Sequence, residues 1–347
     1  MAGTPEPNGR SASWRGVLTG GLVFLLALVA LTETLRLFIP GPAVLYSART
    51  VEIPPQMGVL ELSGHLEAQG VIRNRFTFVA LALVRGTVRT LKAGEYEIPP
   101  RANSLRVLEL LELGKIKPHL LVLPEGFTVR ELARQLEAEG LAPSEAVLAA
   151  SRDRRVLQML GIEADSLEGY LFPDTYQVFK GMQPWEILVR MVQRLREIVT
   201  PDLIEKAQAK GLDLHGLLTL ASIVERETVL REELPVIAAV FWNRLKRDMP
   251  LQADPTVAYA VGKDGRAPTR ADLAVDSPYN TYKHRGLPPT PIGNPGKAAI
   301  MAVLDPAKVN YLYFVSIDDR RHHFSATLDE HNAAAARYRL FRARGLL

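Results

Sequence analysis

One acidic side chain directly follows an apolar run that is typical of a buried helix. The run is Leu-Leu-Thr-Leu-Ala-Ser-Ile-Val at residues 217–224, and Glu225 comes next. Asp213 can cap such a helix, because its short carboxylate accepts hydrogen bonds from the first free amides. A carboxyl group at the end of this helix is partly removed from water, and desolvation disfavours its charged form. We therefore expect a raised pKa for Glu225, which a general acid working near neutral pH requires.

The neighbours of Glu225 on the helix offer it hydrogen-bond partners. Ser222 and Thr228 lie three residues to either side and share its face, so we expect them to orient the acid. Glu227 is two residues away and projects from a different side of the helix, which argues against a joint role of the two glutamates. The alternative interpretation of Glu225 is a polar residue that only ends a core helix.

Polar and aromatic loops follow this helix. They are Gln252–Pro255, Ser277–Tyr282 and Gly286–Pro289. Pyranose rings present apolar C–H faces and a rim of hydroxyl groups, and a site for them needs aromatic faces beside amide and hydroxyl groups. Tyr279, Asn280, Thr281 and Tyr282 supply these groups in one short stretch. The loops therefore predict a glycan-binding cleft.

Asp254 is the candidate for a second carboxylate in this cleft. A glycosidase that hydrolyses its substrate uses an acid together with a base or nucleophile. However, Pro255 and an apolar stretch follow Asp254, a pattern typical of a helix N-cap with proline at the first helical position. We favour this structural role, and a hydrolase with Asp254 as its base is the alternative.

Composition and motifs argue against several other classes of protein. The chain has no cysteine, and His322 and His323 would point to opposite faces of a strand, so we expect no catalytic metal. We find no nucleophile elbow and no phosphate-binding glycine loop, and we expect no cofactor. The 42 basic residues are nearly balanced by 38 acidic ones, without a basic run that aromatic residues interrupt, so nucleic acid is not an expected partner.

An uncharged apolar segment near the N-terminus is long enough to cross a bilayer. Residues 16–32 carry no charge, and with the apolar residues up to 39 the segment reaches the roughly 20 residues that a span needs. We predict a cytoplasmic tail at residues 1–15 and an uncleaved transmembrane helix at residues 16–39. Arg10 and Arg15 indicate, by the positive-inside rule, that the rest of the chain lies outside the cytoplasm. The alternative is a cleaved signal peptide.

The pattern beyond this helix predicts an α+β fold. With 347 residues the chain is long enough for two domains. Three segments each read as a short strand, a turn and an amphipathic helix closed by glycine, and we assign them to a small α+β repeat region at residues 45–145. These segments are Val51–Val71, Tyr96–Gly114 and Leu121–Leu141.

We predict a larger, mixed α/β domain at residues 146–347. We expect a strand at Tyr311–Ser316, with Phe324 on its hairpin partner, and a capping box at Thr327–Glu330 that opens the last helix. Further helices are expected at about residues 186–199, 232–247 and 297–304.

Over about residues 160–335 the sequence resembles the MltG-type (YceG-like) endolytic murein transglycosylases. The matching motifs, in the family's order, are Leu167–Tyr176, Leu220–Thr228, Val240–Leu245, Leu251–Val257, Tyr279–Tyr282, Gly286–Pro289 and Tyr311–Phe314. The resemblance implies an N-terminal transmembrane helix, a small LysM-like α+β region and a larger mixed α/β catalytic domain.

The resemblance also implies an activity and a site. The family cleaves the β-1,4 bond between N-acetylmuramic acid and N-acetylglucosamine in nascent peptidoglycan, leaves a 1,6-anhydromuramic end and limits strand length. Its catalytic glutamate corresponds to Glu225. The substrate-binding residues that the motifs imply are Gln252, Asp254, Tyr279, Asn280, Thr281, Tyr282 and Glu168.

The partners that the resemblance implies are peptidoglycan glycan strands, the membrane bilayer and peptidoglycan synthases. The location that it implies is the cell inner membrane, with a single pass and the catalytic domain outside the cytoplasm. Two alternatives stay open. One is a hydrolytic muramidase with Asp254 as base, which would leave reducing ends, and the other is a non-catalytic wall-binding scaffold.

Overall fold

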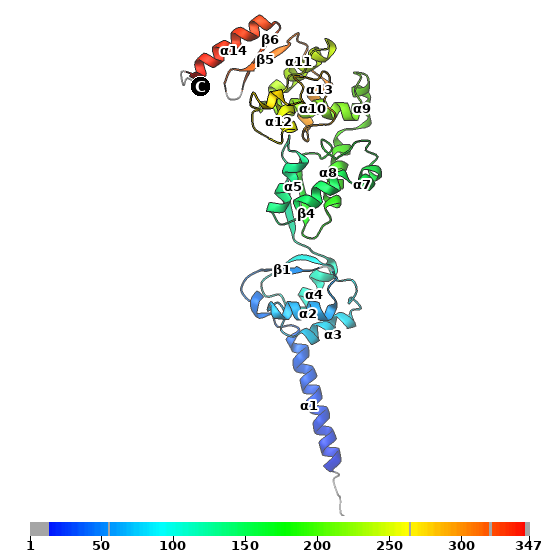
Figure 1. Ribbon diagram of the computed structural model, residues 1–347. Coiled ribbons are helices and arrows are strands. Elements are labelled where there is room, and N and C mark those ends of the chain that lie inside the picture. The colour runs from blue at the N-terminus through cyan, green and yellow to red at the C-terminus, as the bar shows by residue number, and fades with distance from the viewer. Residues whose placement is uncertain (1–13, 55, 264, 319–320, 344–347) are drawn as a thin grey trace, which may run out of the picture. The chain divides into compact units, whose positions relative to one another are not determined.

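The computed structural model describes the chain except residues 1–13, 55, 264, 319–320 and 344–347 (Figure 1). Contacts divide the chain into two compact units. The first unit comprises residues 1–118 with 179–181, and the second comprises residues 119–178 with 182–347. Both contain helices and short strands, so the predicted α+β class is confirmed.

The first unit begins with the long helix α1 and continues as a small α+β core. Its elements are α1 (Trp14–Arg36), a 3-10 turn (Pro42–Val44), β1 (Arg49–Ile53), α2 (Val59–Ala68), α3 (Arg75–Val84), β2 (Gly94–Ile98) and α4 (Ser104–Leu113). Strands β1 and β2 pair antiparallel, with Val51 opposite Tyr96. Both side chains are buried in a cluster with Phe78 of α3 and Leu108 of α4.

Helix α1 covers most of the predicted membrane span at residues 16–39, but it ends at Arg36 and leaves the last three residues outside the helix. Within the described residues, Val17–Arg36 is the one helical stretch long and apolar enough to cross a bilayer, and none of it is buried by the rest of the chain. A signal sequence near an N-terminus has the same length and composition. Insertion in a membrane therefore stays a prediction.

Each predicted strand–turn–helix segment contains a strand followed by a helix. The three pairs are β1 with α2, β2 with α4, and β3 (Pro118–Val122) with α5 (Val129–Ala138). The glycines that close them, Gly70, Gly114 and Gly140, all have φ between 61° and 68°, a left-handed conformation that favours glycine after a helix.

The third segment packs in the second unit. The sequence assigned residues 119–145 to the repeat region at 45–145, whereas the apolar side chains of β3 and α5, such as Leu121 and Leu132, are buried in the core of the second unit. The LysM-like character of the region stays a prediction.

The second unit is mostly helical. After β3 and α5 its elements are α6 (Ser144–Arg152), α7 (Arg154–Met159), β4 (Thr175–Phe179), α8 (Pro184–Ile198), α9 (Pro201–Gln208), α10 (Leu214–Glu227), a 3-10 turn (Arg231–Glu233), α11 (Leu234–Lys246), α12 (Asp254–Ala260), a 3-10 turn (Asp272–Ala274), α13 (Lys297–Leu304), β5 (Tyr313–Ser316), β6 (His322–Ser325) and α14 (Leu328–Ala343). Strand β3 pairs with β4. Strands β5 and β6 form the predicted hairpin, with Phe314 opposite Phe324.

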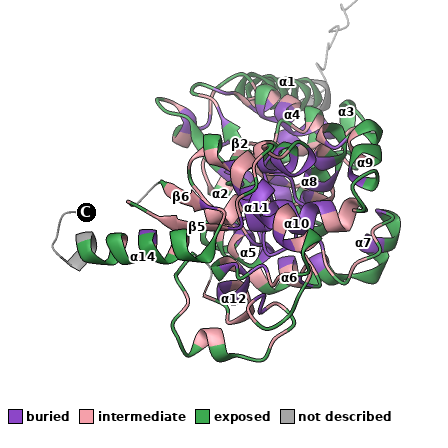
Figure 2. Cartoon of the chain, turned by 90° about the horizontal axis from the view of Figure 1, so that it is seen from above, coloured by how far each residue is buried: buried purple, intermediate pink, exposed green. Residues whose placement is uncertain are grey.

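Helix α10 lies at the centre of this unit. It packs against α11, α12 and α13, and residues 217–224 are all buried, as the purple ribbon of Figure 2 shows. The predicted cap is confirmed, because Asp213 Oδ1 accepts a hydrogen bond from the Gly216 amide at 2.7 Å. An apolar helix with no polar face is stable only when it is buried on all sides. The acidic residues of α10 therefore lie in its last turn, whereas the buried Thr219 and Ser222 donate to carbonyl oxygens of the helix itself.

A buried arginine forms hydrogen bonds both to the loop before α12 and to the residue that precedes strand β5. Arg244 of α11 is 7 % exposed, and its guanidinium donates to the carbonyl oxygens of Leu312, Leu251 and Pro250 at 2.7–3.1 Å. It also donates to Gln252 Oε1 at 3.1 Å. A guanidinium has five donors in a fixed fork, so one side chain can satisfy several loop carbonyl groups at once.

Replacing Arg244 with methionine should destabilise the second unit. The change removes the donors for three loop carbonyl groups, and breaking such a buried network costs about 3–5 kcal/mol of unfolding free energy. Urea denaturation of the full chain in detergent measures the loss. The control is Arg247→Met, at an exposed position one helical turn away, where we expect less than about 0.5 kcal/mol. Equal stability of the two variants would contradict the role given to Arg244.

Candidate active site

Glu225 lies in the last turn of α10, where the buried helix reaches the surface of the unit. Its side chain is half-buried, and Oε2 accepts a hydrogen bond from the Gly296 amide at 2.8 Å. Burial raises the pKa of Glu225, as predicted, and the nearby Glu125 carboxylate acts in the same direction, while the Gly296 amide and the Arg231 cation oppose the rise. The negative end of the helix dipole further disfavours a carboxylate at this position.

The predicted partners of Glu225 on α10 bond elsewhere. Ser222 Oγ donates to the Thr219 carbonyl oxygen and accepts from the Ile292 amide at 3.0 Å. Thr228 Oγ1 donates to Glu233. The expectation that Ser222 and Thr228 orient the acid directly was wrong, because a distant loop supplies the partner of Glu225 instead.

That loop, residues 289–296, runs along α10 and is attached at three points. His215 Nε2 donates to the Pro289 carbonyl oxygen at 2.8 Å, Ser222 binds the Ile292 amide, and Gly296 binds Glu225. Gly293 allows a close approach to the chain opposite, since a Cβ atom there would lie 2.5 Å from the Gly126 carbonyl oxygen. The loop therefore fixes the donor that faces Glu225.

Glu225 lines a cleft of about 410 Å³. Its walls are Glu125, Gly126, Phe127, Glu131, Glu225, Arg226, Glu227, Thr228, Val229, Gly265, Ser316 and His322. A cavity of about 270 Å³ shares Arg226, Glu227 and Gly265 with it. A third, of about 420 Å³, shares Glu227, Ser316 and His322. We call these three adjoining cavities the groove, and all their walls belong to the second unit.

Three of the predicted substrate-binding residues line the groove. Gln252, Asp254 and Tyr282 lie in the wall of the third cavity, and Asp254 also lines the second. The Tyr282 hydroxyl donates to Asp254 Oδ1 at 2.6 Å. Asp254 does not cap α12, which was the role predicted for it. Ala253 is the N-cap and Asp254 is the first helical residue, because the carboxylate is held by Tyr282 instead.

The other four predicted residues hold loops in place. Asn280 is fully buried and donates to the carbonyl oxygens of Leu273 and Val275. Thr281 Oγ1 accepts from the Ala253 amide, which positions the start of α12. Neither side chain lines the three cavities of the groove.

Tyr279 and Glu168 act in the same way. The Tyr279 hydroxyl bonds Thr290 Oγ1 at 2.8 Å, beside the loop that reaches Glu225. Glu168 is buried and accepts from the Val129 amide at 3.0 Å and from the Tyr259 hydroxyl at 3.3 Å. These contacts fix the loops and helix starts around the groove.

Two features of the groove escaped the sequence analysis. Glu227 lines the same cleft as Glu225, although its position on the helix argued against a joint role. The helix ends at this residue, and Gly265 and Ser316 line the same cleft, so its walls come from segments far apart in the sequence. The second feature is the partner of His322, whose Nδ1 bonds Glu233 Oε2 at 2.7 Å across 89 residues of sequence, with both side chains largely buried.

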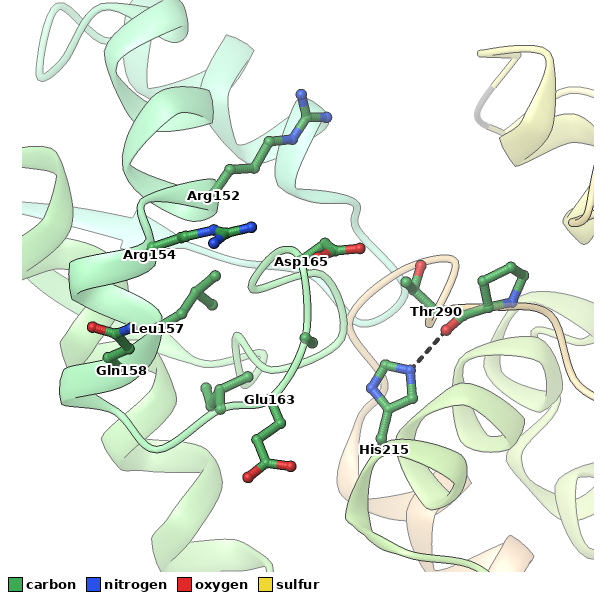
Figure 3. Close-up of a pocket in the computed structure, with 11 residues that line it drawn as sticks. Arg152, Arg154, Leu157, Gln158, Glu163, Asp165, His215 and Thr290 are labelled. Atoms are coloured by element: carbon green, nitrogen blue, oxygen red, sulfur yellow. Dashed lines mark hydrogen bonds between the residues drawn. The ribbon is translucent and has the colours of Figure 1, made fainter.

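Among the described residues, no group of three or more His, Cys, Asp or Glu side chains could hold a metal ion. Another cavity, of about 460 Å³, lies at the opposite end of α10, where His215 donates to the Pro289 carbonyl oxygen (Figure 3). Ten residues of helix, about 15 Å, separate His215 from Glu225. Cavity size alone therefore does not identify the chemical site.

Replacing Ser222 with alanine should loosen the loop that faces Glu225. The change leaves the buried Ile292 amide without its acceptor, at a cost of about 1–3 kcal/mol, so residues 289–296 should open more often. Hydrogen exchange measured by mass spectrometry on this segment should accelerate about tenfold or more. The control is Thr219→Val, which removes only a bond to the His215 carbonyl oxygen within the same helix. Unchanged protection of residues 289–296 in Ser222→Ala would contradict the attachment.

Comparisons with known proteins identify the family of the chain. The model of the YceG-like family matches residues 51–337. An endolytic murein transglycosylase from Bacillus subtilis (strain 168) is 32% identical over 304 residues, which is 83% of this chain and 84% of that protein. One from Streptococcus pneumoniae serotype 2 (strain D39 / NCTC 7466) is 31% identical over 322 residues, and the match covers 83% of this chain and 58% of that protein.

A solved structure gives the same result. The crystal structure of a YceG-like protein from Listeria monocytogenes is 36% identical in sequence and matches with a TM-score of 0.58, covering 83% of this chain and 98% of that one. The family model spans both the strand–helix segments and the groove. The chain therefore belongs to the YceG-like family.

Proposed function

We propose that this chain is a membrane-anchored, endolytic lytic transglycosylase of peptidoglycan. The observation that carries the proposal is the half-buried carboxyl group of Glu225, which the Gly296 amide holds at the wall of a groove. Relatives at 31–32% identity are named endolytic murein transglycosylases, which supports murein as the substrate. The bond cleaved is the β-1,4 bond between N-acetylmuramic acid and N-acetylglucosamine in nascent strands, and cleavage limits strand length.

In this mechanism one carboxyl group serves as both acid and base. Protonated Glu225 gives its proton to the glycosidic oxygen as the bond from that oxygen to C1 of the muramic residue breaks. The carboxylate then takes the proton of the C6 hydroxyl of the same sugar, whose oxygen attacks C1 and closes the 1,6-anhydro ring. An intramolecular nucleophile has a high effective concentration, so no second carboxylate is needed to activate water.

The Gly296 amide has a defined part in this cycle. It stabilises the ionised form of Glu225 after proton donation, while burial favours the protonated form before it. The two effects therefore act on opposite protonation states of one carboxyl group, which gives and regains a proton in this mechanism.

The predicted binding residues divide into two groups. Gln252, Asp254 and Tyr282 line the groove and are assigned direct contact with the sugars. Tyr279, Asn280, Thr281 and Glu168 are assigned the indirect role of holding the loops that form the groove. The structure of the substrate complex would test this division.

The proposed placement follows from α1. Residues 1–15 would lie in the cytoplasm, residues 16–39 would cross the inner membrane and the rest would lie outside the cytoplasm, as a LysM-like region followed by a catalytic domain. The apolar stretch Val17–Arg36 of α1, which lies near the N-terminus, supports this order. Peptidoglycan synthases, which make the nascent strands, are the proposed protein partners.

A second candidate function is hydrolysis of the same bond. Asp254 stands in the cavities that adjoin the cleft of Glu225, so a carboxylate that could act as base toward water is present in the groove. Its hydrogen bond from Tyr282 favours a binding role, because the oxygen concerned is already occupied. The product distinguishes the two, since hydrolysis leaves a reducing end and transglycosylation leaves an anhydro end.

Replacing Glu225 with glutamine should abolish cleavage while the fold stays intact. The amide cannot donate and recover a proton, so we expect kcat on uncrosslinked peptidoglycan strands to fall by about 10³-fold or more. Mass spectrometry of the products measures the loss, and circular dichroism checks the fold. The matched control is Glu232→Gln, at an exposed glutamate on the neighbouring 3-10 turn, which should cleave at the wild-type rate. Substantial activity in Glu225→Gln would refute the mechanism.

A further inference from the structure

Glu227 occupies the point where the three cavities of the groove meet. It is the one residue that lines all three, together with Glu225 in the cleft and with Asp254 in the other two cavities. The mechanism proposed above uses Glu225 and leaves Glu227 without a task. A carboxyl group at such a junction would touch any chain-like ligand that occupies more than one cavity.

The two oxygens of Glu227 have different surroundings. Oε1 is buried and has no hydrogen-bond partner among the described residues. No described residue bonds to Oε2 and this oxygen is not fully buried, so it is the oxygen of Glu227 that a ligand in the groove can reach. A carboxylate would leave negative charge on a buried oxygen that nothing stabilises, whereas the neutral acid leaves only a carbonyl oxygen there and carries its proton on Oε2.

The charges around Glu227 act in the same direction. Burial, with the Asp254 carboxylate of α12 beside it, raises the pKa of Glu227 to about 8, and the cation of Arg244 on α11 opposes the rise. The other titratable groups that line the three cavities are Glu225 and Arg226 of the same helix turn, and, from other segments, Glu125, Glu131, Arg266, Tyr282, His322, His331 and Tyr338. No described residue forms an ion pair with Glu227, so no nearby cation in contact with it stabilises a charged carboxylate.

We propose that Glu227, as the neutral acid, donates a hydrogen bond from Oε2 to the N-acetyl carbonyl oxygen of a sugar that lies in the groove beside Glu225. An N-acetyl group has one carbonyl acceptor and one N–H donor. Glu227 matches the acceptor, and the free oxygen of Asp254, in the same two cavities, matches the donor. The inference rests on the proposed peptidoglycan substrate, and it makes Glu227 a binding residue that transfers no proton.

The test is binding of defined glycans to the full chain in detergent, in a Glu225→Gln background that prevents cleavage. The probes are uncrosslinked, N-acetylated peptidoglycan strands and the same strands after de-N-acetylation. Adding Glu227→Gln, which keeps a donor of the same shape, should change affinity for the acetylated strands by less than about threefold. Adding Glu227→Met, which removes the donor, should weaken it about tenfold, the effect of losing one hydrogen bond of about 1.4 kcal/mol.

The de-N-acetylated strands provide the internal control. They should bind the Glu227→Gln and Glu227→Met variants with equal affinity, because these strands carry an amine in place of the carbonyl oxygen that the glutamine would contact. If Glu227→Met weakens both kinds of strand equally, or neither, the inference is overturned. Equal loss in Glu227→Gln and Glu227→Met would also overturn it, because the glutamine retains the proposed donor.

The pH dependence gives a readout that does not need the methionine variant to fold. With Glu227 present, affinity for the acetylated strands should fall as pH rises from about 7 to 9, because the acid loses the proton that it donates. With Glu227→Gln the affinity should stay constant over this range. Parallel pH profiles would contradict the inference.

Failure of the proposed function has a different signature from failure of this inference. If the chain is no transglycosylase, the wild-type protein, which has both Glu225 and Glu227, yields no anhydro ends. The binding comparison at position 227 does not depend on turnover. If the enzyme is active but its affinity for the glycan does not change with the residue at position 227, the proposed function holds and the proposed role of Glu227 is refuted.

Discussion

The burial of α10 is the constraint on which the site depends. Eight consecutive residues, 217–224, are buried, so the helix has no polar face and its carboxyl groups can stand only at its end. That end is the negative pole of the helix dipole and lies at the boundary between the core and the groove. Both effects disfavour ionised carboxylates there. The same packing that stabilises the unit therefore raises the pKa of Glu225 and of Glu227.

Both glutamates have a raised pKa, but their hydrogen-bond partners and neighbouring charges differ. Glu225 receives the Gly296 amide, which stabilises its charged form, so it can give up a proton and take one back. Glu227 receives no hydrogen bond from the described residues and faces the Asp254 carboxylate, so its neutral form is favoured. One helix end thus supports a group for proton transfer and a group for hydrogen bonding, separated by two residues.

Local sequence patterns predicted much of this arrangement. The apolar run, the Asp213 cap and the strand–turn–helix segments depend on neighbouring residues, and the structure contains them. Asp254 failed as a predicted cap because the Tyr282 hydroxyl, 28 residues away, takes its carboxylate. The partner of Glu225 was also missed, since Gly296 lies 71 residues further along the chain. Contacts of this kind depend on tertiary packing, which a local pattern does not contain.

The central claim is that the attacking oxygen belongs to the sugar and that Glu225 moves its proton. Digestion of uncrosslinked peptidoglycan strands in water enriched with heavy oxygen, followed by mass spectrometry of the new muramic ends, tests this claim most directly. We predict ends that are lighter than hydrolytic products by one water and carry no heavy oxygen. Ends that carry one heavy oxygen atom from the solvent would contradict the account, because water would then be the nucleophile and Asp254 the candidate base.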